Sequence, residues 1–116
     1  MTRLLLVDDD GDALELRRLI FERHGYAVAI ALSAGHAREQ FAAQQPQAVL
    51  LDLRLPRAED GLALIREFRA ASPELRIVVL SGWPADLDGR AEAAMVDAVL
   101  TKPLAAARMV EEVGRK

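Results

Sequence analysis

Five short, continuous runs of aliphatic residues, separated by longer segments with helical periodicity, constrain the fold more than any other feature of this sequence. The runs are Leu4–Val7, Ala27–Ile30, Ala48–Leu51, Ile77–Leu80 and Ala98–Leu100. Runs this short and this apolar are typical of strands buried on both faces of a parallel sheet. Because they alternate with helical segments, we expect an α/β chain in which helices cover both faces of the sheet.

The four segments between these runs and the segment after the last run predict five helices. In the first segment, Leu16, Leu19 and Ile20 share a helical face, with Arg23 at its end, and we expect that face to pack on the sheet. The other helices are expected from Ala34 to Gln44 behind a Ser33 cap, around Leu62 to Arg69, near Leu87 to Ala94, and from Ala106 to Val113.

Five strand–helix units of this kind predict a flavodoxin-like, doubly wound (βα)5 fold with strand order 2-1-3-4-5, because crossovers between parallel strands are right-handed. The length of 116 residues suits one compact domain, and we expect residues 1–116 to form it, with no output domain. The chain has no cysteine, which excludes disulfides and thiolate metal sites.

Charge and hydropathy argue against two classes of partner. The net charge is −3 and the basic residues form no stripe, so we expect no direct binding to nucleic acid. No apolar run approaches the ~20 residues that a membrane span needs, so we expect no membrane contact and a cytoplasmic location.

Polar side chains follow four of the five predicted strands, at the point where each strand ends. Asp8 and Asp9 follow the first strand, Asp52 the third, Ser81 the fourth and Lys102 the fifth. Ligand sites of doubly wound sheets lie beyond the carboxyl ends of the strands, where the strand order switches. In order 2-1-3-4-5 that switch falls between strands 1 and 3, so the three carboxylates should converge, flanked by Ser81 and Lys102.

Three carboxylates at one edge require a compensating cation. Two of them ~4 Å apart repel by about 4 kcal/mol at an effective dielectric constant of 20. A sparse, all-oxygen ligand set open to water favours Mg²⁺ (or Mn²⁺) over a Ca²⁺ cage. Such a site suits phosphoryl transfer, with Asp52 as nucleophile, Lys102 as a second positive charge and Ser81 as a hydroxyl donor.

These residues and their order resemble the response-regulator receiver domains of two-component signalling, over essentially the whole chain. The resemblance is carried by Asp8-Asp9, Asp52, Leu55-Pro56, Asp60-Gly61, Ser81-Gly82 and Lys102-Pro103. Each motif alone is weak, but together, in the correct order and spacing, they are specific.

The resemblance implies a role for each residue of the site. Asp52 corresponds to the phosphoacceptor, Asp9 to the direct Mg²⁺ ligand, and Asp8 to a ligand that acts through a metal-bound water. The backbone carbonyl of Arg54 would also bind the metal. Ser81 would turn toward the phosphoryl group and Lys102 is the invariant lysine, followed in this family by a cis peptide before a proline such as Pro103.

The implied function is a phosphorelay receiver that accepts a phosphoryl group from a sensor histidine kinase or a phosphotransfer protein. It would catalyse only its own phosphorylation and its slow autodephosphorylation, tuned by the side chains of Arg54 and Trp83, and would answer with a conformational output. By the same resemblance, a homodimer would form through the fourth helix, the fifth strand and the fifth helix.

Three positions depart from the family pattern. The loop after Asp52 is one residue longer than usual, Met95 replaces the glycine before the fifth strand, and Val99 replaces the aromatic residue that normally couples to the hydroxyl of Ser81. These departures leave an alternative open, a receiver-like interaction or dimerisation module that phosphorylation does not regulate. A nucleotide-binding enzyme of this fold is disfavoured, because Asp8-Asp9-Asp10-Gly11 is not a glycine-rich phosphate loop.

Overall fold

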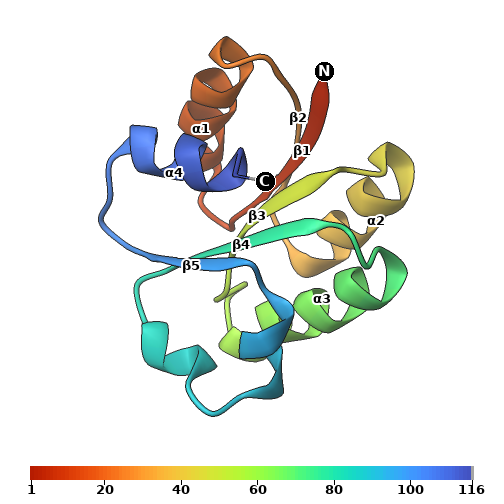
Figure 1. The fold of residues 1–116 in the computed structure, drawn as a ribbon, viewed down its shortest axis with the longest axis vertical. Coiled ribbons are helices and arrows are strands. Elements are labelled where there is room, and N and C mark those ends of the chain that lie inside the picture. Colours follow the sequence, from red (N-terminus) through yellow and green to blue (C-terminus); the bar gives the residue numbers. More distant parts are fainter. Residues whose placement is uncertain (116) are drawn as a thin grey trace.

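The computed structural model describes residues 1–115, which form a five-stranded parallel sheet in the order β2-β1-β3-β4-β5 (Figure 1). The strands are β1 (Thr2–Val7), β2 (Tyr26–Ala31), β3 (Ala48–Asp52), β4 (Arg76–Ser81) and β5 (Ala98–Thr101). The α-helices are α1 (Gly11–Arg23), α2 (Ala34–Gln44), α3 (Ala58–Ala71) and α4 (Ala106–Val113). The predicted fold class and strand order are confirmed. None of the helices in the described residues is long and apolar enough to cross a membrane.

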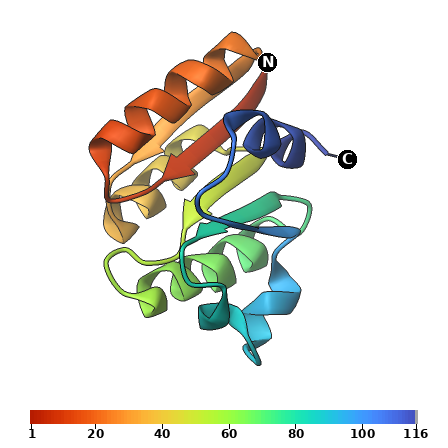
Figure 2. The ribbon, with the colours of Figure 1, turned by 90° about the vertical axis from the view of Figure 1, so that its left-hand side faces the viewer.

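The sheet is buried on both faces, as the continuous apolar runs predict. In the two ribbon views, α2 and α3 lie on one side of the sheet and α1 and α4 on the other (Figures 1 and 2). Successive residues of a strand point to opposite faces. Leu5 and Val7 accordingly belong to the core beneath α2 and α3, and Leu4 and Leu6 to the core beneath α1 and α4.

The inner face of α1 differs from the predicted one. Leu16 and Leu19 are 61% and 49% exposed, whereas Leu14 and Phe21 are fully buried. The inward stripe runs at i, i+3 and i+7 through Leu14, Arg17 and Phe21, so an arginine takes a position that apolar periodicity assigns to a hydrophobic residue. The prediction for Leu16 and Leu19 was therefore wrong, because leucines lie on both sides of this helix and the buried partners decided which side faces inward.

The connection from β4 to β5 also differs from the prediction, since the described residues form no α-helix there. Two 3₁₀ helices replace it, η1 (Pro84–Leu87) and η2 (Ala91–Met95). Between them Gly89 has a positive φ of 72°, a conformation that interrupts a helix. Glu92 anchors the segment through an ion pair with Arg66 of α3.

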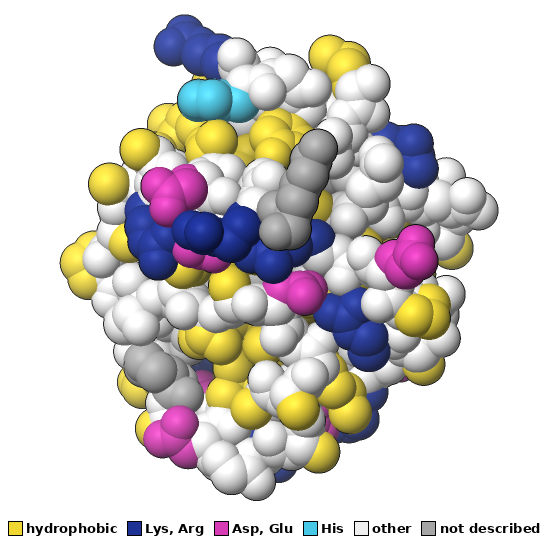
Figure 3. All heavy atoms as spheres, viewed as in Figure 1, with side chains coloured by type: hydrophobic (Ala, Val, Ile, Leu, Met, Phe, Trp, Pro, Cys, Tyr) yellow, Lys and Arg dark blue, Asp and Glu magenta, His cyan; other side chains and the backbone are white. Residues whose placement is uncertain are grey.

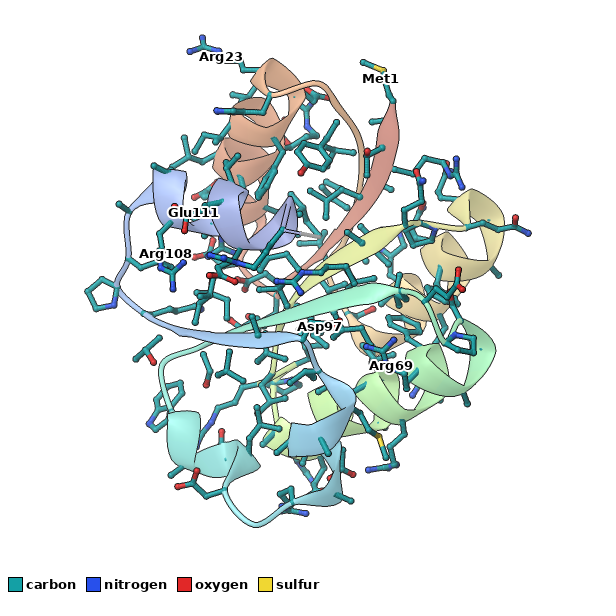
Figure 4. All side chains as sticks on the ribbon, viewed as in Figure 1. Met1, Arg23, Arg69, Asp97, Arg108 and Glu111 are labelled. Carbon is teal, nitrogen blue, oxygen red and sulfur yellow. The ribbon has the colours of Figure 1, made fainter. Side chains whose placement is uncertain are left out.

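Ion pairs fasten the edge of the sheet where β4 and β5 begin. Arg76 at the start of β4 donates two hydrogen bonds, of 3.1 and 2.9 Å, to the carbonyl oxygen of Glu112 in α4. Arg69 at the end of α3 contacts Asp97, which precedes β5, at 3.1 Å, and the two side chains point toward each other in Figure 4. In Figure 3, basic and acidic side chains lie side by side in a band across this face of the molecule.

Gly61 supplies the first testable prediction. It lies in α3, where a Cβ would stand 2.1 Å from the carbonyl oxygen of Leu53 in the loop after β3. We expect Gly61→Ala to lower the free energy of unfolding by about 2 kcal/mol or more, because the clash is with backbone and not with a movable side chain. Urea unfolding followed by circular dichroism measures the change.

Gly35→Ala in α2 is the matched control, because no heavy atom lies within 4 Å of a Cβ at that position. Alanine there should stabilise the domain by up to about 1 kcal/mol. Equal unfolding free energies for Gly61→Ala and the parent protein would contradict the close approach of α3 to the loop.

Candidate functional site

The register of the strands brings the predicted polar residues to one edge of the sheet. Val7 of β1 pairs with Leu51 of β3, so Asp8 and Asp52 follow as the next facing residues. Ser81 pairs with Thr101 across β4 and β5, and Lys102 follows directly. We call this edge, with Asp8, Asp9, Asp52, Ser81 and Lys102, the carboxyl edge.

One ammonium group bridges the buried carboxylate of Asp8 and the largely buried carboxylate of Asp52. Lys102 Nζ donates a hydrogen bond of 2.6 Å to Asp52 Oδ2 and lies 3.8 Å from Asp8 Oδ2. The side chains of Asp8 and Asp52 are only 3% and 12% exposed. A compact ammonium on a flexible stem can satisfy two acceptors that diverge in direction, which the planar fork of an arginine does less well. The peptide between Lys102 and Pro103 is cis, as the resemblance predicts.

Asp8 has a second cation, which the sequence reasoning missed. Arg17 Nη1 of α1 donates to Asp8 Oδ2 at 2.7 Å, and the backbone N–H of Asp10 donates to Asp8 Oδ1 at 3.0 Å. Burial by itself raises the pKa of Asp8, but these hydrogen bonds and the charges of Arg17 and Lys102 outweigh it and hold the pKa below its usual value. The only available signal in the sequence was the inward phase of Arg17 between Leu14 and Phe21.

The pKa of Asp52 is shifted in the opposite direction to that of Asp8. Burial raises its pKa above the usual value for aspartate and the negative charge of Asp8 raises it further, against the hydrogen bond from Lys102. Its Oδ1 accepts a hydrogen bond of 3.2 Å from the backbone N–H of Arg54. Of the two buried carboxyls, Asp52 is therefore the one that takes up a proton first as the pH falls.

The remaining acidic residues after β1 have separate surroundings. Asp10 caps α1, because its Oδ1 accepts from the backbone N–H groups of Asp12 and Ala13 at 3.1 and 3.2 Å. Asp9, the predicted direct metal ligand, is exposed on the turn between β1 and α1.

Ser81, Trp83 and Arg54 form a connected set of contacts, together with a residue that the sequence reasoning did not select. Ser81 is buried and its Oγ accepts from the backbone N–H of Trp83 at 2.9 Å. The guanidinium of Arg54 lies 3.9 Å from the centroid of the Trp83 ring and binds Asp86 with both arms, at 2.9 and 3.2 Å. We call Arg54, Trp83 and Asp86 the Arg54 clasp. It joins the loop after β3 to the loop after β4.

The structure shows what stands at two of the positions that depart from the family pattern, Val99 and the loop after Asp52. Val99 lies on β5 with an exposed side chain, so this position has no ring that could move inward. The long loop after Asp52 contains a cis peptide between Leu55 and Pro56, which was not predicted. The loop ends at Arg57, just before α3, where the backbone N–H of Arg57 donates a hydrogen bond of 3.1 Å to the carboxylate of Asp60.

The donor chemistry of the carboxyl edge suits a hard divalent ion, but the ligands are not preassembled. In residues 1–115, no three His, Cys, Asp or Glu side chains are grouped so as to hold a metal ion, and Asp9 does not join Asp8 and Asp52 in such a group. Hydrogen bonds from Arg17 and Asp10 engage both oxygens of Asp8, and Lys102 occupies Oδ2 of Asp52. Carboxylate oxygens with room for water are nevertheless the ligands that Mg²⁺ prefers.

Comparison with known proteins agrees with this geometry. Residues 4–114 match the family described as response regulator receiver domain. The response regulator MprA of Mycolicibacterium vanbaalenii is 38% identical over 79 residues, which cover 68% of this chain and 34% of MprA. The chain thus spans about a third of the length of the curated relatives that it matches.

Two solved structures illustrate the likeness in fold. A response regulator from Burkholderia pseudomallei with a phosphorylated aspartic acid, a calcium ion and citrate is 26% identical, with a TM-score of 0.84 over 97% of this chain and 66% of that one. TrrA from Thermotoga maritima, in complex with Mg²⁺ and BeF, is 24% identical, with a TM-score of 0.86 over 97% and 96% of the two chains.

The chain belongs to the response regulator receiver domain family. Domains of this family are signalling modules of two-component systems.

The raised pKa of Asp52 predicts an effect on stability. Folding disfavours the ionised carboxylate, so without divalent ions Asp52→Asn should raise the free energy of unfolding near neutral pH. The gain should shrink as the pH falls through the raised pKa toward the ordinary value, about 3.9, because the carboxyl is then protonated in both the folded and the unfolded chain. Urea unfolding at about pH 7.5 and about pH 4.5 tests this.

Asp88→Asn is the control, because Asp88 is exposed in the loop between η1 and η2. A gain for Asp52→Asn that grows toward acid pH would show that folding favours the charged form of Asp52, contrary to the expected sign.

Proposed function

We propose that this domain is a phosphorelay receiver that accepts a phosphoryl group onto Asp52 from a sensor histidine kinase or a phosphotransfer protein. The observation that carries the proposal is the ammonium of Lys102, which bridges Asp52 and the buried Asp8 at the carboxyl edge. The phosphorylated aspartic acid and calcium ion of the Burkholderia pseudomallei relative support it. Its proposed location is the cytoplasm, without direct contact to nucleic acid.

In the proposed reaction, an oxygen of the Asp52 carboxylate attacks phosphorus while the P–N bond of the donor phosphohistidine breaks and the leaving imidazole takes a proton from solvent. Oδ1 is the proposed attacking oxygen, because it accepts only a hydrogen bond of 3.2 Å from the backbone N–H of Arg54, whereas Lys102 holds Oδ2 at 2.6 Å. Lys102 then follows the developing negative charge from the carboxylate to the phosphoryl oxygens.

The proposed cation is Mg²⁺ (or Mn²⁺). Asp9, Asp52, the backbone carbonyl of Arg54 and, through a water, Asp8 would hold it. When bound, the ion supplies positive charge to the attacking and phosphoryl oxygens.

The proposed output begins at Ser81. In the structure, Ser81 Oγ accepts a hydrogen bond of 2.9 Å from the backbone N–H of Trp83. On phosphorylation this bond would break, and the hydroxyl would turn and donate to a phosphoryl oxygen. The loop that carries Trp83 and η1 would follow. Because Val99 has no ring to move, the change would pass through this loop to η2, β5 and α4, the surface proposed for a homodimer.

The Arg54 clasp is proposed to set the lifetime of the phosphoryl group. Its guanidinium and indole lie on the two loops that flank Asp52, and Asp86 holds the guanidinium in place. Autodephosphorylation requires a water molecule in line with the phosphorus, so side chains held over Asp52 should slow it.

A direct test is mass spectrometry of the intact protein after incubation with acetyl phosphate and Mg²⁺. We expect one labile phosphoryl group on the parent protein and on Asp88→Asn, and none on Asp52→Asn, because an amide cannot form the acyl phosphate. Undiminished labelling of Asp52→Asn would remove Asp52 from its role.

The lifetime of the phosphoryl group tests the clasp separately. We expect Asp86→Asn to shorten it several-fold, because Arg54 loses its anchoring carboxylate and water gains access. Phosphorus NMR of the phosphorylated proteins measures the decay. Arg38→Ala is the control, since it breaks an exposed ion pair with Glu67 outside the clasp. Identical decay of Asp86→Asn and the parent would contradict a shielding role.

The second candidate is a receiver-like interaction or dimerisation module without regulation by phosphorylation. The exposed Val99 favours it, and so does the finding that no three acidic or His side chains of residues 1–115 are grouped so as to hold a metal ion. The single tryptophan, Trp83, lies beside Ser81, so Mg²⁺ titration followed by its fluorescence discriminates. A phosphorylatable site should respond in the millimolar range, and an interaction module should not respond.

A further inference from the structure

Arg17 is placed unlike the other arginine that adjoins it on α1. Arg18 pairs with Glu15 and Glu22 on the surface of the same helix. Arg17 instead turns inward between the buried Leu14 and Phe21, and its side chain is 14% exposed. Packing alone does not account for a charged residue at this inward position, since a hydrophobic side chain would fill it at lower desolvation cost.

The contact that Arg17 makes is with the site itself. Its Nη1 donates to Asp8 Oδ2 at 2.7 Å, where the carboxylate is 3% exposed. Solvent and salt screen such a sheltered pair only weakly. The guanidinium therefore acts on the carboxyl edge as a fixed positive charge.

With Arg17, the Asp8–Asp52 pair of the carboxyl edge is balanced in charge before any metal binds, and of the edge's carboxylates only the exposed Asp9 has no ion pair within residues 1–115. Asp8 has Arg17 and Asp52 has Lys102, one cation for each buried carboxylate. A divalent ion that uses Asp8, directly or through a water, must share Oδ2 with the guanidinium or displace it. Either course adds repulsion between like charges to the free energy of metal binding.

We infer that Arg17 is a positioning residue that competes with the divalent cation for Asp8 and so weakens the affinity of the carboxyl edge for metal. The inference rests on the proposed function, because it assumes that Mg²⁺ binds there. It adds a residue of α1 to the site and makes metal loading depend on the release of that residue. Without metal, the charges of Asp8 and Asp52 are balanced by Arg17 and Lys102. The metal concentration at which the site fills then depends on the contact between Arg17 and Asp8.

The test compares metal affinities of the parent, Arg17→Met, Arg17→Gln and Arg18→Met proteins. Mn²⁺ binding measured by electron paramagnetic resonance reports the bound ion itself, which a merely structural role of Arg17 would leave unchanged. Mg²⁺ titration followed by Trp83 fluorescence gives a second reading. We expect Arg17→Met and Arg17→Gln to bind both ions about tenfold tighter or more, because a repelling charge next to a metal ligand is gone.

Arg18→Met removes the same charge from the adjacent position of α1 without touching Asp8, and its affinity should change less than about twofold. Arg17→Gln keeps a polar donor at the position and decides the question if Arg17→Met does not fold. In an Asp8→Asn background, the gain from Arg17→Met should become smaller, because the shared acceptor is lost.

The outcomes separate the inference from the proposed function. Unchanged or weaker metal binding in both Arg17 variants, with measurable binding in the parent, overturns the competition and leaves the proposed metal site standing. Tighter binding in Arg18→Met to the same degree overturns it as well, because the effect would then be one of net charge. Absence of binding in every variant removes the metal site and the inference together.

Discussion

Two buried carboxylates on neighbouring strands are the constraint on which the site depends. Taking such charges out of water costs several kcal/mol each, and the cost is offset only if cations and hydrogen-bond donors reach them. Lys102 reaches both from the end of β5, and Arg17 reaches Asp8 from α1. These interactions do not act equally on the two carboxyls. They hold the pKa of Asp8 below its usual value, whereas burial and the charge of Asp8 raise the pKa of Asp52. The two carboxyls, similar in sequence context, thus have different proton affinities.

The rest of the domain keeps these groups in place through contacts at both ends of the strands. Where β4 and β5 begin, Arg76 and Arg69 bind the chain to α4 and to Asp97. At the carboxyl edge, Asp52 and Ser81 are the last residues of their strands and Asp8, Asp9 and Lys102 begin the loops that follow, so a packed sheet is the scaffold that presents the reactive groups. Gly61 belongs to this scaffold, since its missing side chain lets α3 lie against the loop that follows Asp52.

The segment between β4 and β5 is where the domain differs most from the expected pattern. Two short 3₁₀ helices have fewer internal hydrogen bonds than one α-helix, and such elements open at lower free energy. Trp83 stands at the start of this segment and is tied to Arg54 across the site. A domain that lacks an aromatic residue at Val99 therefore still has a direct contact between the loop after Asp52 and the segment leading to β5.

The sequence alone determined the sheet, its strand order and the residues at its carboxyl edge, because continuous apolar runs and the polar residues that end them are local signals. The resemblance to the receiver family also predicted the cis peptide before Pro103. The inner face of α1, the contact of Arg17 with Asp8, the Arg54 clasp and the 3₁₀ helices were decided by the tertiary structure. Each depends on which of several equivalent neighbours a side chain meets. Leucines on both sides of α1 left its rotation open, and partners 9 and 32 residues apart along the chain, Asp8 with Arg17 and Arg54 with Asp86, become neighbours only when the strands are in register.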